Sequence, residues 1–317
     1  MRLVAVTADD NALLEGIADL MNRDNESSGF ADYSEVWDAG MVRLWVERED
    51  EMFRLIAAVT DGGGVVGFAL INGWGCSVSP VVDPGAPVWL AEEVADALIA
   101  IGSSALRGMG CGGLIRLSAG IMGGFRHSLM RAVAAPIGEE VSGALMVLRH
   151  LTKRQPPAGY VVRSVKPDED REALEAIARV RKEAFSEYGW EPVDADDLRP
   201  YYADLFRRYR YVLVAVAYVG DGEPAGYVEA FVHKALSGRL VGEVSMVAAR
   251  PEHRSRGLGS FLVAWACERL LERADLVYLY AVGAVRGFYH RLGFSEEAWF
   301  IRLFIRPSIR LPQLLIE

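Results

Sequence analysis

One segment of the sequence combines glycines and arginines in a way that suits the binding of an anion. The segment 253–260 reads His-Arg-Ser-Arg-Gly-Leu-Gly-Ser and follows an apolar stretch, 242–249, that is typical of a buried strand. An amphipathic pattern over 261–273 predicts a helix directly after it. The N-terminus of a helix presents unpaired N–H groups and a partial positive charge, and both stabilise a bound phosphate. The order strand, loop, helix therefore predicts a pyrophosphate-binding loop.

The individual residues of this loop fit the same chemistry. Gly257 and Gly259 have no Cβ, so the backbone can adopt positive φ angles and approach phosphate oxygens closely. Arg254 and Arg256 can supply positive charge at the rim. Two other nucleotide-binding loops are excluded, because a P-loop needs Gly-Lys-Ser/Thr and a dinucleotide-binding fingerprint needs a small residue where Leu262 stands. Without the surrounding motifs, an ordinary turn is an alternative interpretation of this loop.

A wider pattern surrounds the loop. An apolar strand ends in Ala-Arg-Pro-Glu, Arg-x-x-Gly-x-Gly follows, and after a helix and a strand comes Phe-Tyr-x-x-Leu-Gly-Phe at 288–294. From Tyr160 to about Pro307 this order resembles the GNAT N-acyltransferase superfamily. The resemblance implies an α/β (α+β) fold in which a mixed, mostly antiparallel sheet is flanked by helices. It also implies that the sheet splays open between its fourth and fifth strands, where acyl-CoA lies.

The same resemblance implies which residues hold the co-substrate, for which acetyl-CoA is expected. The backbone of Val247 and Ala249 would pair with the pantetheine arm, while Arg254 would lie at the rim of the phosphate site. The backbone amides that would hold the pyrophosphate belong to Ser255, Arg256, Gly257, Leu258, Gly259 and Ser260.

Two residues occupy positions that carry catalytic groups in the family. Tyr289 stands where members often place a tyrosine that protonates the departing CoA thiolate, and packing is its competing interpretation. Glu243 lies eleven residues before Arg254, a spacing at which several members place the general base. An amine with a pKa near about 10 must lose a proton before it attacks, which gives such a base its task. A solvated carboxylate at a strand end is the competing interpretation for Glu243. The chain departs from the family at Val282, seven residues before Tyr289, where members often carry an asparagine.

The resemblance also implies that the acidic segment 185–202 shapes the acceptor site. Tyr188, Trp190 and Glu191 in this segment could attract and sandwich a cationic amine, although a solvated acidic connector fits equally well. We therefore expect acyl transfer to a primary amine of a small molecule or peptide, by direct attack on the thioester. Two alternatives stay open. One is a non-catalytic acyl-CoA-binding regulatory protein, and the other is an enzyme like the mycothiol synthases, whose tandem arrangement and Gly-Glu-Val strand the chain resembles.

The two halves of the sequence repeat one order of patterns. The hairpin pattern at 53–71 matches that at 211–231, and Gly-Phe-Arg-His at 124–127 matches Gly-Phe-Tyr-His at 287–290. An ordered series of matches indicates tandem copies of one domain. The expected parts are a first copy at 1–151, a Pro-containing linker at 152–159 and a second copy at 160–317.

The first copy lacks the features of the anion site. At 79–88 it carries prolines, which have no N–H, and Asp83, which would repel a phosphate. Arg126 stands at the position that matches Tyr289. The first copy is therefore expected to be a degenerate, GNAT-like domain without catalytic activity.

Composition narrows the remaining possibilities. The net charge of −9 disfavours nucleic acid as a partner, and carboxylates interrupt every apolar stretch, so no membrane span is expected. The N-terminus shows no secretory pattern, which favours a cytoplasmic protein. A monomer or a homodimer is expected. Cys76, Cys111 and Cys267 are widely separated and lack CxxC spacing, so reduced thiols are expected. The five histidines form no ligand pattern, and no metal is expected.

Overall fold

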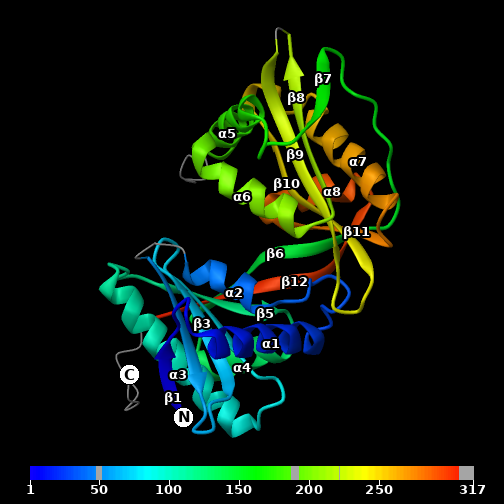
Figure 1. The fold of residues 1–317 in the computed structure, drawn as a ribbon. Helices are drawn as coiled ribbons and strands as arrows, with labels where there is room; N and C mark the ends of the chain where they lie inside the picture. The colour runs from blue at the N-terminus through cyan, green and yellow to red at the C-terminus, as the bar shows by residue number, and fades with distance from the viewer. Residues whose placement is uncertain (48–51, 187–192, 221, 307–317) are drawn as a thin grey trace. The chain divides into compact units, whose positions relative to one another are not determined.

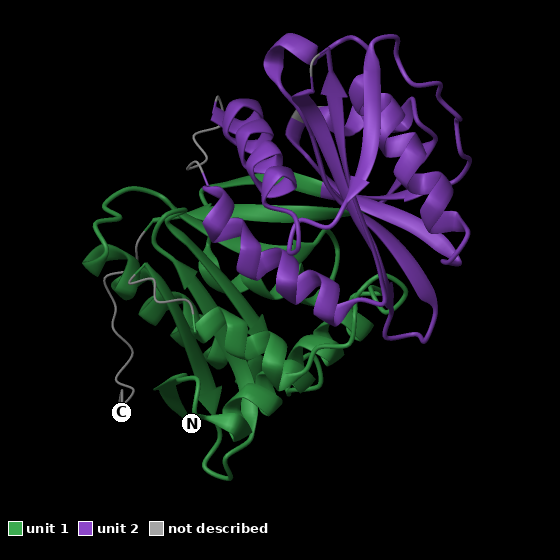
Figure 2. Ribbon diagram, turned by 45° about the horizontal axis from the view of Figure 1, so that its top comes forward, with its two compact units in different colours: residues 1–143, 298–317 green, residues 144–297 purple. Residues whose placement is uncertain are grey.

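The computed structural model describes residues 1–47, 52–186, 193–220 and 222–306 (Figure 1). The chain divides into two compact units, which Figure 2 shows in different colours. Unit 1 comprises Met1–Gly143 together with Ala298–Glu317, and unit 2 comprises Ala144–Glu297. No helix within the described residues is long and apolar enough to cross a membrane.

Both halves of the chain fold through the same order of elements. The first series is β1 (Arg2–Ala5), α1 (Asn11–Ser27), α2 (Ala39–Val46), β2 (Phe53–Val59), β3 (Val65–Asn72), β4 (Ser77–Val82), α3 (Val88–Gly108), β5 (Ile115–Ile121), α4 (Phe125–Ala134) and β6 (Gly138–Leu148). The second series is β7 (Tyr160–Val165), α5 (Arg171–Phe185), α6 (Ala195–Arg208), β8 (Tyr211–Val219), β9 (Glu223–Lys234), β10 (Leu240–Ala249), α7 (Leu258–Leu271), β11 (Leu276–Val282), α8 (Arg286–His290) and β12 (Phe294–Ile305), with short 3-10 turns at η2 (Pro251–His253) and η3 (Gly283–Val285). The shared order confirms the tandem repeat predicted from the sequence.

The sheet of unit 2 is antiparallel except at one place. Strands β7, β8, β9 and β10 pair antiparallel in that order, and β11 follows β10 as a parallel neighbour. Among the described residues, β10 and β11 pair only over Val241–Glu243 with Leu276–Tyr278. Beyond these residues the two strands separate. The mixed, mostly antiparallel sheet that opens between its fourth and fifth strands is the predicted fold class.

The sheet of unit 1 runs from β1 to β5 in chain order, and the C-terminal part of β12 lies next to β5. Phe300–Ile305 of β12 pair with Ile115–Ile121 of β5, although β12 ends the second series of elements. The strand β6, in turn, neighbours β11. The boundaries of the compact units therefore fall inside β6 and β12, and the expected linker at 152–159 lies within unit 2.

Helices cover both faces of the unit 2 sheet because successive strand residues face opposite sides. On one face, α5 and α6 contribute Leu174 and Tyr202 to a core that includes Tyr227 of β9. On the other face, α7 contributes Leu262 to a core that includes Val244 of β10. Glu229 lies two positions after Tyr227 on β9 and therefore faces α5 and α6 as well.

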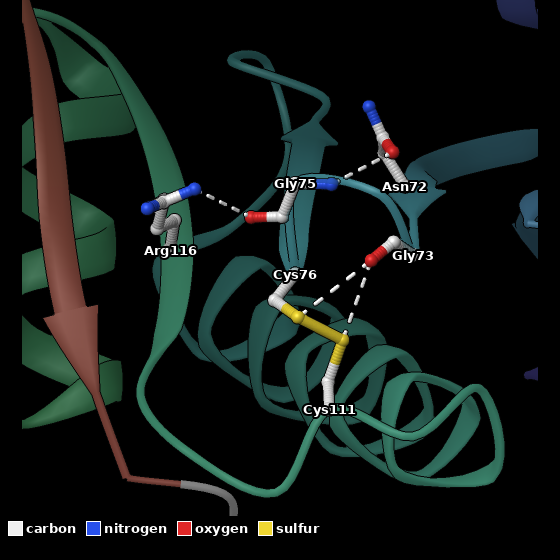
Figure 3. Close-up of a disulfide and its surroundings, with 6 residues drawn as sticks. All are labelled: Asn72, Gly73, Gly75, Cys76, Cys111 and Arg116. Carbon is white, nitrogen blue, oxygen red and sulfur yellow. Dashed lines mark hydrogen bonds between the residues drawn. A yellow bond between two sulfur atoms is a disulfide. The ribbon is translucent and has the colours of Figure 1, made fainter. Parts of the chain in front are cut away.

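A disulfide links Cys76 and Cys111 in unit 1 (Figure 3), which corrects the expectation that the cysteines are reduced thiols. Cys76 directly precedes β4 and Cys111 follows α3, so the chain passes through a strand and a helix between them. Folding brings their Cα atoms to 5.8 Å, and both sulfur atoms lie against the carbonyl oxygen of Gly73. The two residues are 35 positions apart, which is why sequence spacing did not reveal the pair. Cys267 of α7 is free and buried.

Candidate functional site

The predicted anion-binding loop joins β10 to α7 in unit 2. Helix α7 begins at Leu258, directly after Gly257, whose φ of 85° lies in the left-handed region that favours glycine. The first helical hydrogen bond runs from the N–H of Phe261 to the carbonyl of Gly257, at 3.0 Å. Among the described residues, the backbone N–H groups of 255–260 have no acceptor. This row of N–H groups is available to an anion.

The charged side chains of the loop serve different purposes. The guanidinium of Arg254 donates to the carbonyl oxygens of Ala184, at 2.7 Å, and Ala249, at 3.4 Å. His253 is buried, and its Nδ1 lies 3.0 Å from the hydroxyl of Tyr160 on β7. Arg254 and His253 therefore hold the shape of the loop. Arg256 is exposed and forms no ion pair within the described part of the chain, so it is the loop arginine that a ligand can reach.

The edge of β10 next to the loop carries outward-facing backbone groups. The N–H of Arg250 donates to the carbonyl of Ala225 at 2.9 Å, which makes these two residues a hydrogen-bonded pair of the β9–β10 ladder. Such pairs alternate with pairs that are not hydrogen-bonded. The N–H groups of Val247 and Ala249 therefore point away from β9, toward the edge from which β11 has separated.

Glu243 lies where β10 and β11 stop pairing. Its carboxylate accepts a hydrogen bond from the hydroxyl of Tyr278 on β11, at 2.6 Å. The same hydroxyl lies 3.0 Å from Nε2 of His233 on β9, and because Tyr278 donates its single proton to Glu243, Nε2 must be the donor. Burial lowers the pKa of His233 to about 4, so its ring is neutral at pH 7. Glu243 is thus a half-buried carboxylate held in place, which differs from a freely solvated strand-end residue.

Tyr289 lies on α8, with its ring packed against Phe288 and Phe294 at centroid distances of 5.0 Å and 5.9 Å. Its hydroxyl forms no hydrogen bond with any described residue. Burial, with a smaller contribution from Cys267, raises the pKa of Tyr289 to about 12. The half-buried side chain therefore packs against the core and keeps its proton at neutral pH, as a general acid must.

The remaining predicted contacts concern the acceptor. Tyr188, Trp190 and Glu191 lie outside the described residues, and their role stays a prediction. The structure brings the other predicted residues to one region of unit 2. Glu243, Val247 and Ala249 lie along β10, the loop continues that strand, and Tyr289 follows β11 by way of η3.

Sequence reasoning missed a buried carboxylate on β9. Glu229 is 1% exposed, and its Oε1 accepts hydrogen bonds from the hydroxyls of Tyr201, at 2.5 Å, and Ser245, at 2.9 Å. The available signal was a single glutamate inside the apolar run 225–232. His233 and Tyr278 were missed as well, because no local pattern links residues on different strands.

The matching loop of unit 1 is built differently. The carboxylate of Asp83 accepts the N–H of Gly85 at 3.0 Å and also pairs with Arg23, at 3.0 Å. Helix α3 begins at Val88, directly after Pro87, which has no N–H. A carboxylate of the chain itself thus accepts the N–H of Gly85 in this turn, and Pro84 and Pro87 offer none.

The counterpart of Tyr289 in unit 1 also has another role. Arg126 of α4 pairs with Asp24 of α1 at 2.5 Å, and the Asp24 side chain is 1% exposed. Burial raises the pKa of Asp24, while the neighbouring guanidinium opposes this shift. Arg126 is engaged in a buried ion pair and offers no weak acid.

Comparison with known proteins bears on both units. Residues 174–294 match the acetyltransferase (GNAT) family. This range includes Glu243, the loop at 253–260 and Tyr289. Unit 2 therefore contains a GNAT acetyltransferase domain. The match supports acyl transfer from an acyl-CoA to an amine as the general activity. No curated protein matches the chain by sequence.

Solved structures extend the GNAT fold over both units. The chain is similar to a tandem GNAT protein from the clavulanic acid biosynthesis pathway, with a TM-score of 0.69 and 17% identity over 97% of this chain and 99% of that one. A GCN5-related N-acetyltransferase from Sphaerobacter thermophilus gives a TM-score of 0.63 and 17% identity over 98% and 97% of the two chains. A GNAT-family acetyltransferase from Colwellia psychrerythraea gives 0.61 and 12% over 96% and 100%. These likenesses show a shared tandem fold. Within the described residues, no group of three or more His, Cys, Asp or Glu side chains is placed to hold a metal ion.

Proposed function

We propose that the GNAT domain of unit 2 transfers an acetyl group from acetyl-CoA to a primary amine, which attacks the thioester directly. The observation that carries this proposal is the meeting of two features at one end of β10. An open strand edge can pair with an extended arm that contains amides, and the unpaired N–H groups of 255–260 can hold a diphosphate.

The proposed binding mode follows from these groups. The backbone amides from Ser255 to Ser260 hold the pyrophosphate, with Arg256 adding charge from the rim. The outward-facing backbone of Val247 and Ala249 pairs with the pantetheine arm. An N–H group of β10 polarises the thioester carbonyl and stabilises the negative charge that develops on its oxygen.

The chemical step needs a base and an acid. The amine nitrogen attacks the carbonyl carbon, and its proton passes to Glu243, directly or through a water molecule. The C–N bond forms, the C–S bond breaks, and the departing thiolate takes the hydroxyl proton of Tyr289. Tyr278 and His233 orient Glu243 through the chain of hydrogen bonds between β9, β11 and β10. The products are the N-acetylated amine and free CoA.

A thiol-release assay with acetyl-CoA and a panel of amines, peptides and aminoglycosides tests the proposal. We expect turnover with at least one amine, and a loss of about 10²- to 10⁴-fold in kcat for Glu243→Gln and Tyr289→Phe, because each removes a group that transfers a proton. Glu272→Gln, at the exposed C-terminal end of α7, is the matched control and should be as active as the wild type.

Each contrary result points to a different conclusion. Tight binding of acetyl-CoA without turnover of any acceptor would favour a non-catalytic acyl-CoA-binding protein. Turnover confined to a cysteinyl pseudodisaccharide would favour an enzyme like the mycothiol synthases. An unchanged kcat in Tyr289→Phe would remove the acid assignment while leaving the acetyl transfer intact.

A further inference from the structure

The hairpin that leads into the candidate site differs between the two units. In unit 2, the pairing of β10 with β9 shifts between Val244 and Met246, so that Ser245 forms a β-bulge. In unit 1, β3 and β4 pair without any shift from Gly67–Val82 to Asn72–Ser77. The same hairpin can therefore be built without a bulge. The bulge is a local feature of the unit that carries the anion-binding loop.

Side chains from two other elements hold this bulge. The hydroxyl of Ser245 donates to Oε1 of Glu229 on β9, and the hydroxyl of Tyr201 on α6 donates to the same oxygen. Oε2 of Glu229 is buried and has no hydrogen-bond partner among the described residues. Burial lowers the pKa of the Arg181 guanidinium on α5, but nearby groups that include Glu229 raise it overall. Arg181 therefore lies close enough to Glu229 to interact with it. A buried carboxylate thus joins β9, the bulge of β10 and α6.

The fold does not require this carboxylate. Glu229 pairs with Met246 three positions after Gly226, and the matching residue in unit 1, three positions after Gly67, is Leu70. Burying a carboxylate is costly even when hydrogen bonds and a nearby cation offset part of the cost. A leucine at this position fits the same hairpin without that cost. The difference calls for a role in the chemistry of unit 2.

The bulge determines which backbone groups of β10 face the open edge. It lies between Glu243 and Val247. One inserted residue reverses the alternation of a strand, so that groups after it that would have faced one side face the other. With the bulge in place, the N–H groups of Val247 and Ala249 face away from β9. Without it, Glu243 and these N–H groups would no longer keep the same relative orientation.

We propose that Glu229 is a positioning residue, which, together with Tyr201, fixes the Ser245 bulge so that the N–H groups of β10 are aimed at the thioester carbonyl. This inference rests on the proposed acetyl transfer. It extends that function to three residues that do not themselves react. Their effect should appear in kcat, because a small misplacement of a hydrogen-bond donor weakens the transition state more than the ground state.

Replacement of Glu229 by the residue of unit 1 is the most direct test. We expect Glu229→Leu to fold with a lowered Tm, because the hydroxyls of Ser245 and Tyr201 lose their acceptor, and to lose about 10²-fold in kcat, while the KM for acetyl-CoA changes little. Hydrogen exchange at the amides of 244–248 should become faster. Glu229→Gln keeps an acceptor oxygen for Ser245 and Tyr201 and should recover most of the activity, and Glu272→Gln is again the control.

The possible failures can be told apart. If the wild-type chain is active and Glu229→Leu has the same kcat and the same exchange rates, this inference is overturned and the acetyl transfer stands. If Glu229→Gln is as impaired as Glu229→Leu and both lose Tm in parallel, Glu229 has a structural role only. If the wild-type chain neither binds acetyl-CoA nor releases thiol, the proposed function fails and the inference fails with it.

Discussion

His233 contacts Tyr278, the hydrogen-bond partner of Glu243, and its titration makes the free energy of unfolding depend on pH. Its pKa is about 4 in the folded chain, against a reference value of 6.5. Above pH 6.5 both states are neutral at this residue and it has no effect. As the pH falls from 6.5 to about 4, the unfolded chain binds a proton that the folded chain does not, so the free energy of unfolding decreases, by about 3 kcal/mol in total.

His233→Gln should remove this dependence. We expect the variant to lose less stability than the wild type between pH 7 and pH 4.5 when both are unfolded by urea. His290→Gln replaces an exposed histidine and serves as the control, which should keep the wild-type slope. An identical decline in His233→Gln and the wild type would show that His233 is not held neutral by burial.

At the scale of single residues, the sequence predicts some candidate site residues but not their hydrogen-bond partners. Glu243 and Tyr289 could be proposed because each stands at a fixed distance from a local motif. Glu229, Ser245 and Tyr278 could not, because their hydrogen bonds join residues 16 to 45 positions apart on different elements. Such partners depend on strand register, which is a property of the folded sheet.

Gly257, directly before α7, and Gly259, in the first turn of α7, have different structural requirements. A Cβ on either residue would have its nearest neighbour at 3.7 Å, which is an ordinary contact. The two glycines differ in backbone conformation, because Gly257 has a φ of 85°. Gly257→Ala should therefore destabilise the chain by about 1–2 kcal/mol through its backbone conformation. Gly259→Ala lies inside a helix and should stabilise it by up to about 1 kcal/mol. Thermal unfolding should show shifts of opposite sign, and shifts of the same sign would contradict this account of the loop.

The disulfide constrains β4 relative to the segment before β5. Its cysteines are 35 positions apart, and a loop of this length corresponds to about 4 kcal/mol in the chain-entropy treatment. Reductant should lower the Tm of the wild type and leave that of the Cys76→Ala/Cys111→Ala double variant unchanged. Titration of thiols in denaturant should detect one thiol without reductant, from Cys267, and three with it. Three thiols before reduction would show that the bridge does not form.

At the scale of elements, local patterns predicted the strand, loop and helix around 253–260 because each has its own periodicity or turn residues. They did not predict that Phe300–Ile305 would pair with β5, since an apolar strand carries no mark of the strand it will join. The expected linker at 152–159 has turn-forming composition, yet the compact units divide inside β6 and β12. Composition indicated the connection between β6 and β7, but the pairing of β6 and β12 with other strands decides where the compact units divide.

For the whole molecule, the repeat raises the question of how many acetyl-CoA molecules one chain binds. Both units contain the same order of elements, but among the described residues the loop of unit 2 presents six consecutive N–H groups without acceptors, at 255–260, whereas the turn of unit 1 presents two, at Val88 and Trp89. In unit 1 the carboxylate of Asp83 takes the place of an anion. We therefore expect calorimetry on the full chain to give one acetyl-CoA per chain.

A matched pair of variants separates the two loops in that measurement. Gly257→Asp places a carboxylate in the loop of unit 2, as Asp83 does in unit 1, and should weaken binding by about tenfold or more through repulsion of the diphosphate. Asp83→Asn removes the charge in unit 1 and should leave both affinity and stoichiometry unchanged, because Pro84 and Pro87 still lack N–H groups. Two molecules per chain, or weaker binding in Asp83→Asn, would mean that unit 1 binds CoA by groups other than those that make the loop of unit 2 an anion site.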